Sequence, residues 1–555
     1  MGAPVSGSIS MAKMTGGQAV VESLIAQGVT TVFGIVSVHN LHIFDALRDA
    51  TEQGRIRFIG GRHEHALVCM ADGYARATGT PGVLITSSGP GAADSVGALG
   101  ESYHSSVPVL EITTDIEHDL VNKGHGSTHE PKDQLGMFAS VTGWQSMAES
   151  VVDVPNQIAG AMEHLKTQHP RPAVVVIPTD LLGESADVEI IPARELPKAK
   201  AEQASVNRAA ELLASAKSLV LWGGKGVMTS GASAELVELA ELLGAPVVTG
   251  DGGKGAIPED HPLALGSSLG GRLWGKNPLH EYIANCDVAL VAGGSLPYRS
   301  TTGVGLKLPK QLIQVDIDPS MFGRNYPVEV GLAGDAKAVL RQLLDALSNR
   351  EPSSSGHAEA TDLRLKSQAS VREQFPNELH MWEAIRGILP RNATIVFDST
   401  MPVYCAERCF PAYEPLTYHL PHGWVSVGYG FAASLGMKAA LPNRPVVCVT
   451  GDGGFQYNMQ EIGTAVQYGL APVVLIFNDS AWGSLKFHQD QSMGGRNFGV
   501  HLENPDFPKL AEAYAVDAVR VDNLDQLLWE LQRALNSDRI QIIEVVIPNG
   551  LSNFR

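Results

Sequence analysis

Two acidic residues of this chain each follow an apolar stretch, and one of them lies inside a glycine run. The run is Gly451-Asp452-Gly453-Gly454, and Asp479 comes 27 residues after Asp452. The stretches 445–450 and 473–477 are typical of buried strands, and the pattern between them predicts a helix. A strand, a helix and a strand in this order form a βαβ unit, whose parallel strands end at the same edge of a sheet. Open α/β sheets bind ligands at that edge, so we expect both carboxylates to face a ligand.

The residue types at this edge suit a hard divalent cation that holds a diphosphate. Mg²⁺ takes one or two protein carboxylates and completes its octahedron with phosphate oxygens, carbonyls and water. Glycines let the backbone approach the phosphates closely. A second glycine run, Gly250-Asp251-Gly252-Gly253, has Pro278 at the matching distance. Because proline has no ligand chemistry, we interpret the second run as a turn and the first as the ligand site.

The first run resembles the motif of the thiamine diphosphate enzymes, in the group of acetohydroxyacid synthase, pyruvate oxidase and benzaldehyde lyase. Their signature is Gly-Asp-Gly, followed at the same spacing by Asn or Asp. The resemblance extends from about Met14 to Pro548 and implies that Mg²⁺ is bound by Asp452, Asp479 and the backbone carbonyl of Ala481. The other positions that it implies around the cofactor here are Gly451, Gly453, Gly454, Trp482 and Gly483.

A carboxylate far upstream belongs to the same implied cofactor site. Glu64 follows the apolar stretch 56–60 and precedes a helix pattern that ends near Gly79. Taken alone, Glu64 could be a first-turn carboxylate favoured by the helix dipole. The resemblance implies a further role, a hydrogen bond to N1′ of the aminopyrimidine that stabilises its 4′-imino tautomer. A carboxylate in a water-poor site can share a proton with a ring nitrogen in this way.

Three further positions are implied to lie against the cofactor. Gly89 belongs to a Gly-Pro-Gly turn that resembles the family's turn beside the active site, and Val427 aligns with the bulky residue that bends the cofactor into its V shape. Val425 lies two residues before Val427. The chain departs from the family at Asp94, where Asn is frequent, and at Val36-Ser37, where Pro-Gly is usual. Both departures fall near the expected substrate pocket, so the natural substrate stays open.

Two histidines are candidates for contact with the substrate. His39 follows the first predicted strand, where benzaldehyde-lyase-like enzymes place an active-site histidine, and His129 lies in the loop after the stretch 109–113. A neutral imidazole can relay protons to a substrate alkoxide near pH 7. A loop histidine is also often a hydrogen-bonded surface residue, so the pattern alone keeps both interpretations open.

The order of elements predicts an α/β protein with three doubly wound parallel-sheet domains. We expect a disordered tail at 1–14, a pyrimidine-binding domain at 15–190, a central Rossmann-like domain at 204–347 and a diphosphate-binding domain at 360–555. Strand and helix patterns alternate in each domain, as in folds built from βαβ units. The segments 192–203 and 348–359 are polar and have the composition of linkers.

The central domain is the one in which some members of the family hold FAD. Its loop Gly223-Gly224-Lys225-Gly226 lacks the full Gly-x-Gly-x-x-Gly run of dinucleotide sites. Relatives that hold FAD carry an Arg-Phe-Asp stretch where this chain has Gly-Ser-Leu-Pro-Tyr at 294–298. We therefore expect a structural role for this domain and keep bound FAD as the alternative.

Composition argues against nucleic-acid and membrane partners. The 555 residues include 59 acidic and 41 basic side chains, and a formal net charge of −18 does not suit a basic nucleic-acid-binding face. No apolar run reaches about 18 residues, so we predict no membrane span. The first ten residues lack the charged start of a secretion signal, and 5 cysteines are too few for a disulfide framework. We expect a cytoplasmic protein.

The resemblance implies a Mg²⁺- and thiamine diphosphate-dependent 2-oxo acid decarboxylase or carboligase, similar to acetolactate synthase. The resemblance implies that the C2 ylide of the cofactor attacks the keto carbon, CO₂ leaves, and the enamine is protonated or captured by a second carbonyl. A benzaldehyde lyase-like acyloin lyase or ligase and an FAD-dependent 2-oxo acid oxidase are the alternatives. The resemblance also implies a cofactor shared between the first domain of one subunit and the third domain of another. A homodimer is then the smallest active unit, and a homotetramer is usual.

Overall fold

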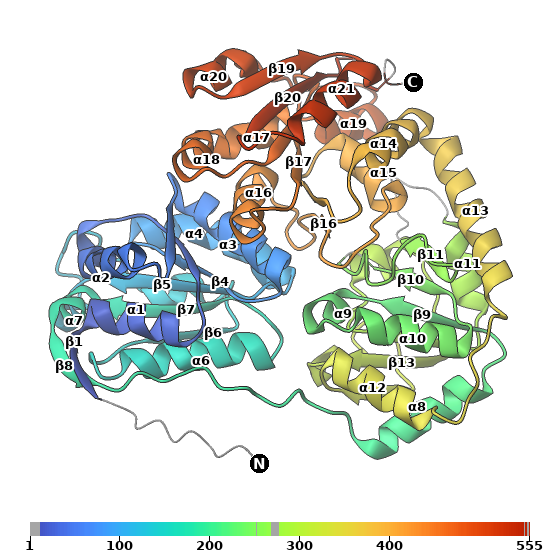
Figure 1. The fold of residues 1–555 in the computed structure, drawn as a ribbon, viewed down its shortest axis with the longest axis horizontal. Helices are drawn as coiled ribbons and strands as arrows, with labels where there is room; N and C mark the ends of the chain where they lie inside the picture. The colour runs from blue at the N-terminus through green and yellow to red at the C-terminus, as the bar shows by residue number, and fades with distance from the viewer. Residues whose placement is uncertain (1–10, 251, 268–276, 549, 552–553, 555) are drawn as a thin grey trace.

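The computed structural model describes residues 11–250, 252–267, 277–548, 550–551 and 554. The described chain contains three six-stranded sheets, one in each third, and neighbouring strands within each sheet are parallel (Figure 1). A separate antiparallel pair joins β1 (Ala12–Thr15) to β8 (Ser185–Val188). The predicted α/β class with three parallel-sheet domains is therefore confirmed.

The first sheet has the strand order β3-β2-β4-β5-β7-β6. Its central strands are buried and almost continuously apolar, which is typical of parallel sheets covered by helices on both faces. Helix α1 begins where Thr15 and Gln18 form a capping box. The elements are β2 (Thr31–Gly34), β3 (Arg57–Gly60), β4 (Gly82–Ile85), β5 (Val109–Asp115), β6 (Trp144–Met147), β7 (Ala173–Pro178), α1 (Gly16–Ala26), η1 (Val38–Asn40), α2 (Leu41–Glu52), α3 (Glu64–Thr78), α4 (Pro90–His104), α5 (Gln134–Phe138), α6 (Val154–Thr167) and α7 (Thr179–Gly183).

The second sheet has the order β11-β10-β9-β12-β13-β14 and its own apolar core. Two glycines in the left-handed conformation, Gly231 and Gly244, end its helices α9 and α10. The elements are α8 (Gln203–Ser215), β9 (Leu219–Gly223), α9 (Lys225–Ser230), α10 (Ser233–Leu243), β10 (Val247–Thr249), β11 (Ala264–Ser267), α11 (Pro278–Asn285), β12 (Val288–Ala292), β13 (Gln311–Asp316), β14 (Val330–Ala333) and α12 (Ala336–Ala346).

The third sheet has the order β16-β15-β17-β18-β20-β19. The chain leaves β15 toward one edge and returns to β17 on the other side, so the carboxyl ends of β15 and β17 border a topological switch point. The elements are α13 (His357–Gln374), α14 (Pro376–Ile388), β15 (Thr394–Phe397), α15 (Met401–Cys409), β16 (Tyr418–His419), α16 (Tyr429–Ala440), β17 (Val446–Gly451), α17 (Asp452–Asn458), α18 (Ile462–Tyr468), β18 (Val473–Asn478), α19 (Gly483–Ser492), α20 (Phe507–Ala513), β19 (Asp517–Val521), α21 (Leu524–Ala534) and β20 (Gln541–Val546).

The first and third domains share one hydrophobic core, although the whole middle domain separates them in sequence (Figure 1). Helices α3 and α16 lie against each other at its centre. A Cβ atom at Gly73 would overlap the carbonyl oxygen of Ala433, and one at Gly436 would overlap that of Met70. These two glycines therefore allow the two helix backbones to touch, and they hold the two domains in a fixed relation.

Two expected boundaries are wrong. Residues 12–14, expected in a disordered tail, belong to β1, because they pair with β8 at the far end of the first domain; residues 1–10 lie outside the described range. The expected linker 348–359 ends early, because α13 begins at His357. Ala360 of this helix is fully buried in an apolar cluster of the middle domain, and Arg364 donates hydrogen bonds to carbonyls of that domain. In the second glycine run, residues 252–255 form turns, and Asp251 lies outside the described residues.

Candidate active site

The two acidic residues of the glycine motif lie at the ends of neighbouring strands. Strands β17 and β18 pair in parallel, with Gly451 opposite Phe477. Asp452 follows β17 as the first residue of α17, and Asp479 follows β18 directly. The βαβ unit thus positions both carboxylates at the carboxyl edge of the sheet, beside its switch point.

The glycines of this site are required by close contacts. A Cβ atom at Gly453 would lie 2.5 Å from the ring of Trp482, and one at Gly454 would lie 3.1 Å from Oδ2 of Asp398. A Cβ atom at Gly483 would overlap Oδ2 of Asp479. Any larger residue at these positions would fill the space around the two carboxylates, so the glycines keep this edge open to a ligand.

The electrostatics of the acidic pair favour a bound cation. Asp452 is almost fully buried, and burial raises its pKa. Burial, together with the nearby charge of Asp452, raises the pKa of Asp479 to about 6. Two partly desolvated carboxylates that repel each other are stabilised by a divalent cation. No group of three or more His, Cys, Asp or Glu side chains gathers around a metal-sized gap among the described residues. Two carboxylates are nevertheless enough for Mg²⁺ when phosphate oxygens complete its shell, so the residues present fit a Mg²⁺-diphosphate.

The segment after β18 holds the other predicted residues of this site close to Asp479. The N–H of Ala481 donates to Oδ1 of Asp479 at 3.2 Å, and the N–H of Trp482 donates to the carbonyl of Val500 at 2.8 Å. Ala481 also forms an isolated antiparallel bridge with His501. Gly483 then begins α19.

Asn504 is a residue of this site that sequence reasoning missed. Its Nδ2 donates to Oδ2 of Asp452 at 2.6 Å and to Oδ1 of Asn478 at 2.9 Å. Gln456 donates to its side-chain oxygen at 2.9 Å. Asn504 therefore orients the first carboxylate and ties it to the end of β18. It lies in a loop far from either motif, and no pattern in the sequence indicates this contact.

Asp398, at the carboxyl end of β15, was missed as well. It is 1% exposed, and its carboxylate accepts the N–H groups of Gly428 and Gly430, both at 3.1 Å. Burial raises its pKa to about 6. The side chain of Asn458 donates to the carbonyl of Gly428 at 2.6 Å. The segment that carries the predicted cofactor residue Val427 is thus fixed at its end by Asp398 and Asn458.

Glu64 is the first residue of α3, directly after the cap residue His63. It is half-buried, and a Cβ atom at Gly91 would lie 3.3 Å from its Oε1. Burial raises its pKa, and the nearby charge of Asp94 adds to this effect. A carboxyl group with a raised pKa in a partly dry site can exchange a proton with a ring nitrogen. Its surroundings therefore suit the role implied by the resemblance.

The two candidate histidines stack on each other, with ring centroids 4.6 Å apart and an interplanar angle of 27°. Burial and the positive charge that His129 would carry lower the pKa of His39, so His39 is neutral near pH 7. Within the described part of the chain, neither Nδ1 atom has a hydrogen-bond partner, although both are buried. The structure therefore leaves two polar atoms without protein partners, which a bound ligand could satisfy.

The Gly-Pro-Gly turn connects the histidine pair to Glu64. Gly89, which precedes α4, has a φ of 60°, and a Cβ atom there would lie on the backbone of His129. Its N–H donates to the side chain of Gln134 at 3.0 Å. Two residues later, Gly91 lies against Glu64. The predicted residues His39, His129, Gly89 and Glu64 thus form one cluster in the first domain.

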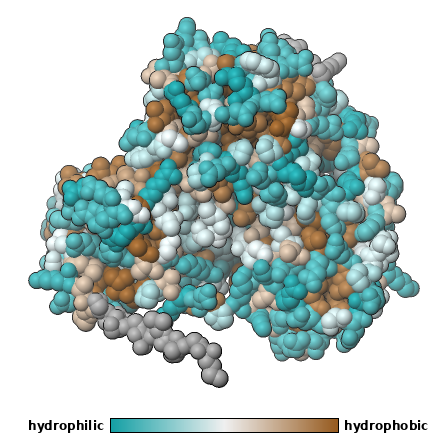
Figure 2. Space-filling model, in the orientation of Figure 1, coloured by the Kyte–Doolittle hydropathy of each residue, from teal (hydrophilic) through white to brown (hydrophobic). Residues whose placement is uncertain are grey.

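Within one chain, the cluster of His39, His129, Gly89 and Glu64 and the acidic pair lie at opposite ends of α17. His65 is the neighbour of Glu64, and its Nδ1 lies 3.3 Å from Nδ2 of Asn458, the last residue of α17. Asp452 is the first residue of that helix. The seven residues of α17 span about 10 Å. Apolar side chains on both sides are exposed, including Val36, Val38 and Leu41 around His39 and Tyr457 and Leu485 near the acidic pair. Figure 2 shows hydrophobic patches among hydrophilic residues on one face of the molecule.

In the central domain, the glycine loop after β9 packs closely against neighbouring backbone. Cβ atoms at Gly224 and Gly226 would both lie on the backbone of Gly293. Lys225, between them, donates to the carbonyl of Ser105 in the first domain. These contacts account for the glycines without a dinucleotide, and the structural role of this domain stays a prediction.

Separately, none of the described helices is both long and apolar enough to span a membrane.

Comparison with known proteins identifies each third of the chain. Models described as the N-terminal TPP binding domain, the central domain and the C-terminal TPP binding domain of thiamine pyrophosphate enzymes match residues 14–137, 206–343 and 398–545. A probable 2-ketoarginine decarboxylase of Pseudomonas aeruginosa is 35% identical over 96% of this chain and 94% of the relative. A probable acetolactate synthase large subunit of Methanocaldococcus jannaschii is 32% identical (96% and 92%). The acetolactate synthase isozyme 3 large subunit of Escherichia coli K12 is 31% identical (97% and 96%).

Proposed function

The chain belongs to the thiamine pyrophosphate enzyme family, and from this premise we propose that it is a Mg²⁺-dependent enzyme that decarboxylates a 2-oxo acid. Members of this family form or cleave carbon–carbon bonds with the help of thiamine diphosphate, and this chain is such an enzyme. The observation that carries the Mg²⁺ assignment is the acidic pair at the carboxyl ends of β17 and β18, in which burial and the charge of Asp452 raise the pKa of Asp479.

Asp452 and Asp479 would bind the cation, with the carbonyl of Ala481 as a third ligand, and Gly453 and Gly454 would admit the diphosphate. Bound thiamine diphosphate supplies an acidic thiazolium carbon and an electron sink for the carbanion that decarboxylation leaves. Asn504 keeps Oδ2 of Asp452 oriented, so the pair is preorganised for the cation. Replacing one buried carboxylate by its amide would weaken the site, because the neutral side chain no longer offsets the charge of the metal.

Glu64 would hold a proton at its carboxyl group and share it with the pyrimidine nitrogen of the cofactor. Its raised pKa makes the carboxyl a better proton acceptor than an exposed glutamate, because burial disfavours the anion. Gly91 leaves room beside Oε1, where a bulkier residue would crowd the carboxylate. Glu64 is therefore the residue of the first domain to which we assign a catalytic role with most structural support.

His39 and His129 would hold or move a proton at the carbonyl oxygen of the substrate. The neutral imidazole of His39 can both donate and accept a hydrogen bond, and the buried Nδ1 atoms of both rings have no partner among the described residues. The exposed apolar side chains around His39 suit a site that substrate and a second subunit complete together. We therefore propose a homodimer as the smallest active unit, with one cofactor between the two chains.

The fate of the reaction intermediate divides the candidate activities. Among the relatives, one is named as a decarboxylase of 2-ketoarginine and others as acetolactate synthases. The acidic Asp94 beside Glu64 favours a 2-oxo acid with a positively charged side chain over pyruvate. A carboligase similar to acetolactate synthase is the second candidate, because most of the relatives compared bear that name.

Release of CO₂ from a panel of 2-oxo acids tests the proposal. The purified enzyme, loaded with thiamine diphosphate and Mg²⁺, would be assayed with pyruvate, 2-oxobutyrate and 2-oxo-5-guanidinovalerate, and the products would be examined for aldehyde and for acetolactate. We expect CO₂ from at least one acid. Aldehyde from benzoin with no CO₂ from any acid would favour an acyloin lyase instead, and hydrogen peroxide formation by a yellow protein would favour an FAD-dependent oxidase.

A further inference from the structure

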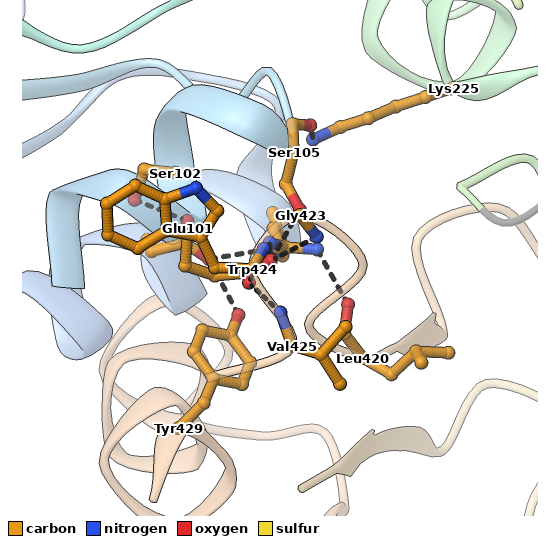
Figure 3. Close-up of polar contacts among 11 residues, drawn as sticks. Glu101, Ser102, Ser105, Lys225, Leu420, Gly423, Trp424, Val425 and Tyr429 are labelled. Carbon is orange, nitrogen blue, oxygen red and sulfur yellow. Dashed lines mark hydrogen bonds and ion pairs between the residues drawn. The ribbon is translucent and has the colours of Figure 1, made fainter. Parts of the chain in front are cut away.

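Glu101 of the first domain contacts the segment that precedes α16 in the third domain. It lies in α4, is 1% exposed, and accepts the backbone N–H groups of Gly423 at 3.0 Å, Trp424 at 2.8 Å and Val425 at 3.0 Å (Figure 3). Three consecutive N–H groups thus converge on one carboxylate, as they do on an anion. The contact crosses the boundary between two domains that are far apart in sequence.

The remaining partners of Glu101 are donors as well. Ser105 donates to its Oε1 at 2.5 Å, and Arg76 donates at 3.5 Å. The guanidinium of Arg76 is itself held by Asp72 at 2.5 Å and donates to the carbonyl of Leu420 at 3.0 Å. Because every partner donates, the site requires a side chain with two acceptor oxygens, which a carboxylate provides. Glutamine would turn an amide N–H toward backbone N–H groups.

The segment 423–425 is held in a conformation that it would not keep by itself. Val425 has a φ of 58°, a left-handed conformation that is strained for a β-branched residue. Its neighbour Trp424 packs so closely on α4 that a Cβ atom at Gly100 would overlap its ring. A Cβ atom at Gly423 would lie 2.8 Å from the carbonyl oxygen of Glu101. The hydrogen bonds to Glu101 and this close contact maintain the strained backbone.

The same segment leads directly to Val427. It is bound by Glu101 at its start and by Asp398, which accepts the N–H of Gly428, at its end. Lys225 of the middle domain donates to the carbonyl of Ser105 at the end of α4, so all three domains meet beside Glu101 (Figure 3). Neither the glycine motif nor Glu64 lies in this junction, which makes it a separate determinant of the site.

We propose that Glu101 is a positioning residue for the cofactor: its carboxylate fixes 423–425 so that Val425 and Val427 present a preformed surface to thiamine diphosphate. The inference rests on the proposed function, since it requires that this segment contacts the cofactor. Loss of the carboxylate should leave the fold intact, because the α3–α16 core joins the same two domains independently. It should instead weaken cofactor binding and change the asymmetric environment of the bound cofactor.

The test compares Glu101→Gln with Glu235→Gln in the full-length protein. Glu235 is also buried and paired with Arg341 at 3.3 Å, but it lies in the middle domain, away from the segment. Calorimetric titration in excess Mg²⁺ should give a thiamine diphosphate Kd at least about 10-fold higher for Glu101→Gln, because a segment that is correctly ordered in only about a tenth of the free molecules lowers the apparent affinity by that factor. The Kd of Glu235→Gln should stay within about twofold of that of the unmodified protein. The near-ultraviolet circular dichroism of the bound cofactor should change only in Glu101→Gln, while both variants stay folded.

Gly100→Ala provides a second variant that retains the carboxylate and displaces the ring of Trp424, and we expect its Kd to rise as well. Unchanged affinity and circular dichroism in Glu101→Gln would overturn the inference and leave the proposed function intact. An equal loss in Glu235→Gln would also overturn it, because the effect would then be general. If Glu101→Gln does not fold, unchanged affinity in Gly100→Ala overturns it. If the unmodified protein takes up no cofactor, the proposed function fails, and the inference fails with it.

Discussion

At the scale of single residues, the candidate site depends on carboxylates kept in partly dry surroundings. Burial raises the pKa of Glu64, Asp452 and Asp479, yet the neighbours of each group differ. The charge of Asp452 adds to the cost of ionising Asp479, and a cation would offset this cost. Glu64 has room beside its oxygen and no lysine or arginine partner among the described ion pairs. One environment therefore suits metal binding and the other suits proton transfer.

Replacing Glu64 by glutamine should separate binding from turnover. The amide keeps the size of the side chain but cannot take up a proton, so we expect kcat to fall at least about 100-fold, the usual contribution of a general acid–base group. The Kd for thiamine diphosphate should change much less. Steady-state kinetics and calorimetry check both. Glu22→Gln, at a half-buried position of α1 where Glu22 pairs with Arg55, is the control, and activity of Glu64→Gln equal to that of the control would remove Glu64 from the mechanism.

Some of these residues could be proposed from the sequence, and others could not. Asp452, Asp479 and Glu64 belong to local patterns, in which an apolar strand is followed by a polar residue and a helix. Asn504, Asp398 and Glu101 act on segments that are distant in the chain, and only the packing of strands and helices reveals their contacts. His39 and His129 were singled out separately, and the sequence did not indicate that they stack.

At the scale of elements, α4 connects two parts of the candidate site. Its first turn lies beside Glu64 and His129, and its last turns carry Glu101. One face of the same helix covers β5, where Glu111 is completely buried and accepts hydrogen bonds from Ser95 at 3.0 Å and Thr86 at 2.6 Å. Burial raises the pKa of Glu111 to about 8. In the described part of the chain its second oxygen has no hydrogen-bond partner.

Glu111 should make the stability of the protein fall as the pH rises from 4.5 to about 8. In that window the folded protein keeps a proton that the unfolded chain releases, so each increase of one pH unit lowers the free energy of unfolding. Glu111→Gln lacks this titration. We therefore expect the Tm of Glu111→Gln minus the Tm of the unmodified protein to be at least about 3 °C larger at pH 8 than at pH 5. Scanning calorimetry or dye-based melting checks this, with Glu22→Gln as control, and parallel pH profiles would contradict it.

The element boundaries show where local patterns lose their predictive value. The stretches 445–450 and 473–477, predicted as strands, agree with β17 and β18 to within one residue, because an apolar run determines each of them. Strand β1 and the first turn of α13 were missed because each is stabilised by a distant partner. β1 needs β8, and α13 needs the middle domain. Neither partner can be read from the residues of the segment itself.

At the scale of the whole molecule, the chain has two parts of a cofactor site in one rigid unit. The shared core of α3 and α16 fixes the first domain against the third. In that arrangement Glu64 is near the end of α17 that is opposite to Asp452. A second chain related by symmetry could bring its own Glu64 to this acidic pair, as we propose.

Mixing two inactive variants tests this arrangement. Glu64→Gln and Asp452→Asn should each be inactive alone. If a site takes Glu64 from one chain and Asp452 from the other, a mixed dimer has one intact site and one doubly altered site. The purified mixed dimer should then have about half of the original activity. Co-expression with two affinity tags, followed by assay of the doubly purified species, checks this. A mixture that stays inactive would indicate that each chain contains a complete site.

The most direct test of the account is calorimetric titration of the purified protein with thiamine diphosphate, in excess Mg²⁺ and again in EDTA. We expect saturable binding with Mg²⁺, a large loss of affinity in EDTA, and a similar loss with Mg²⁺ in Asp479→Asn. Binding that is equally tight without the metal would contradict the assignment of the acidic pair. Absence of binding in excess Mg²⁺ would contradict the proposed function as a whole.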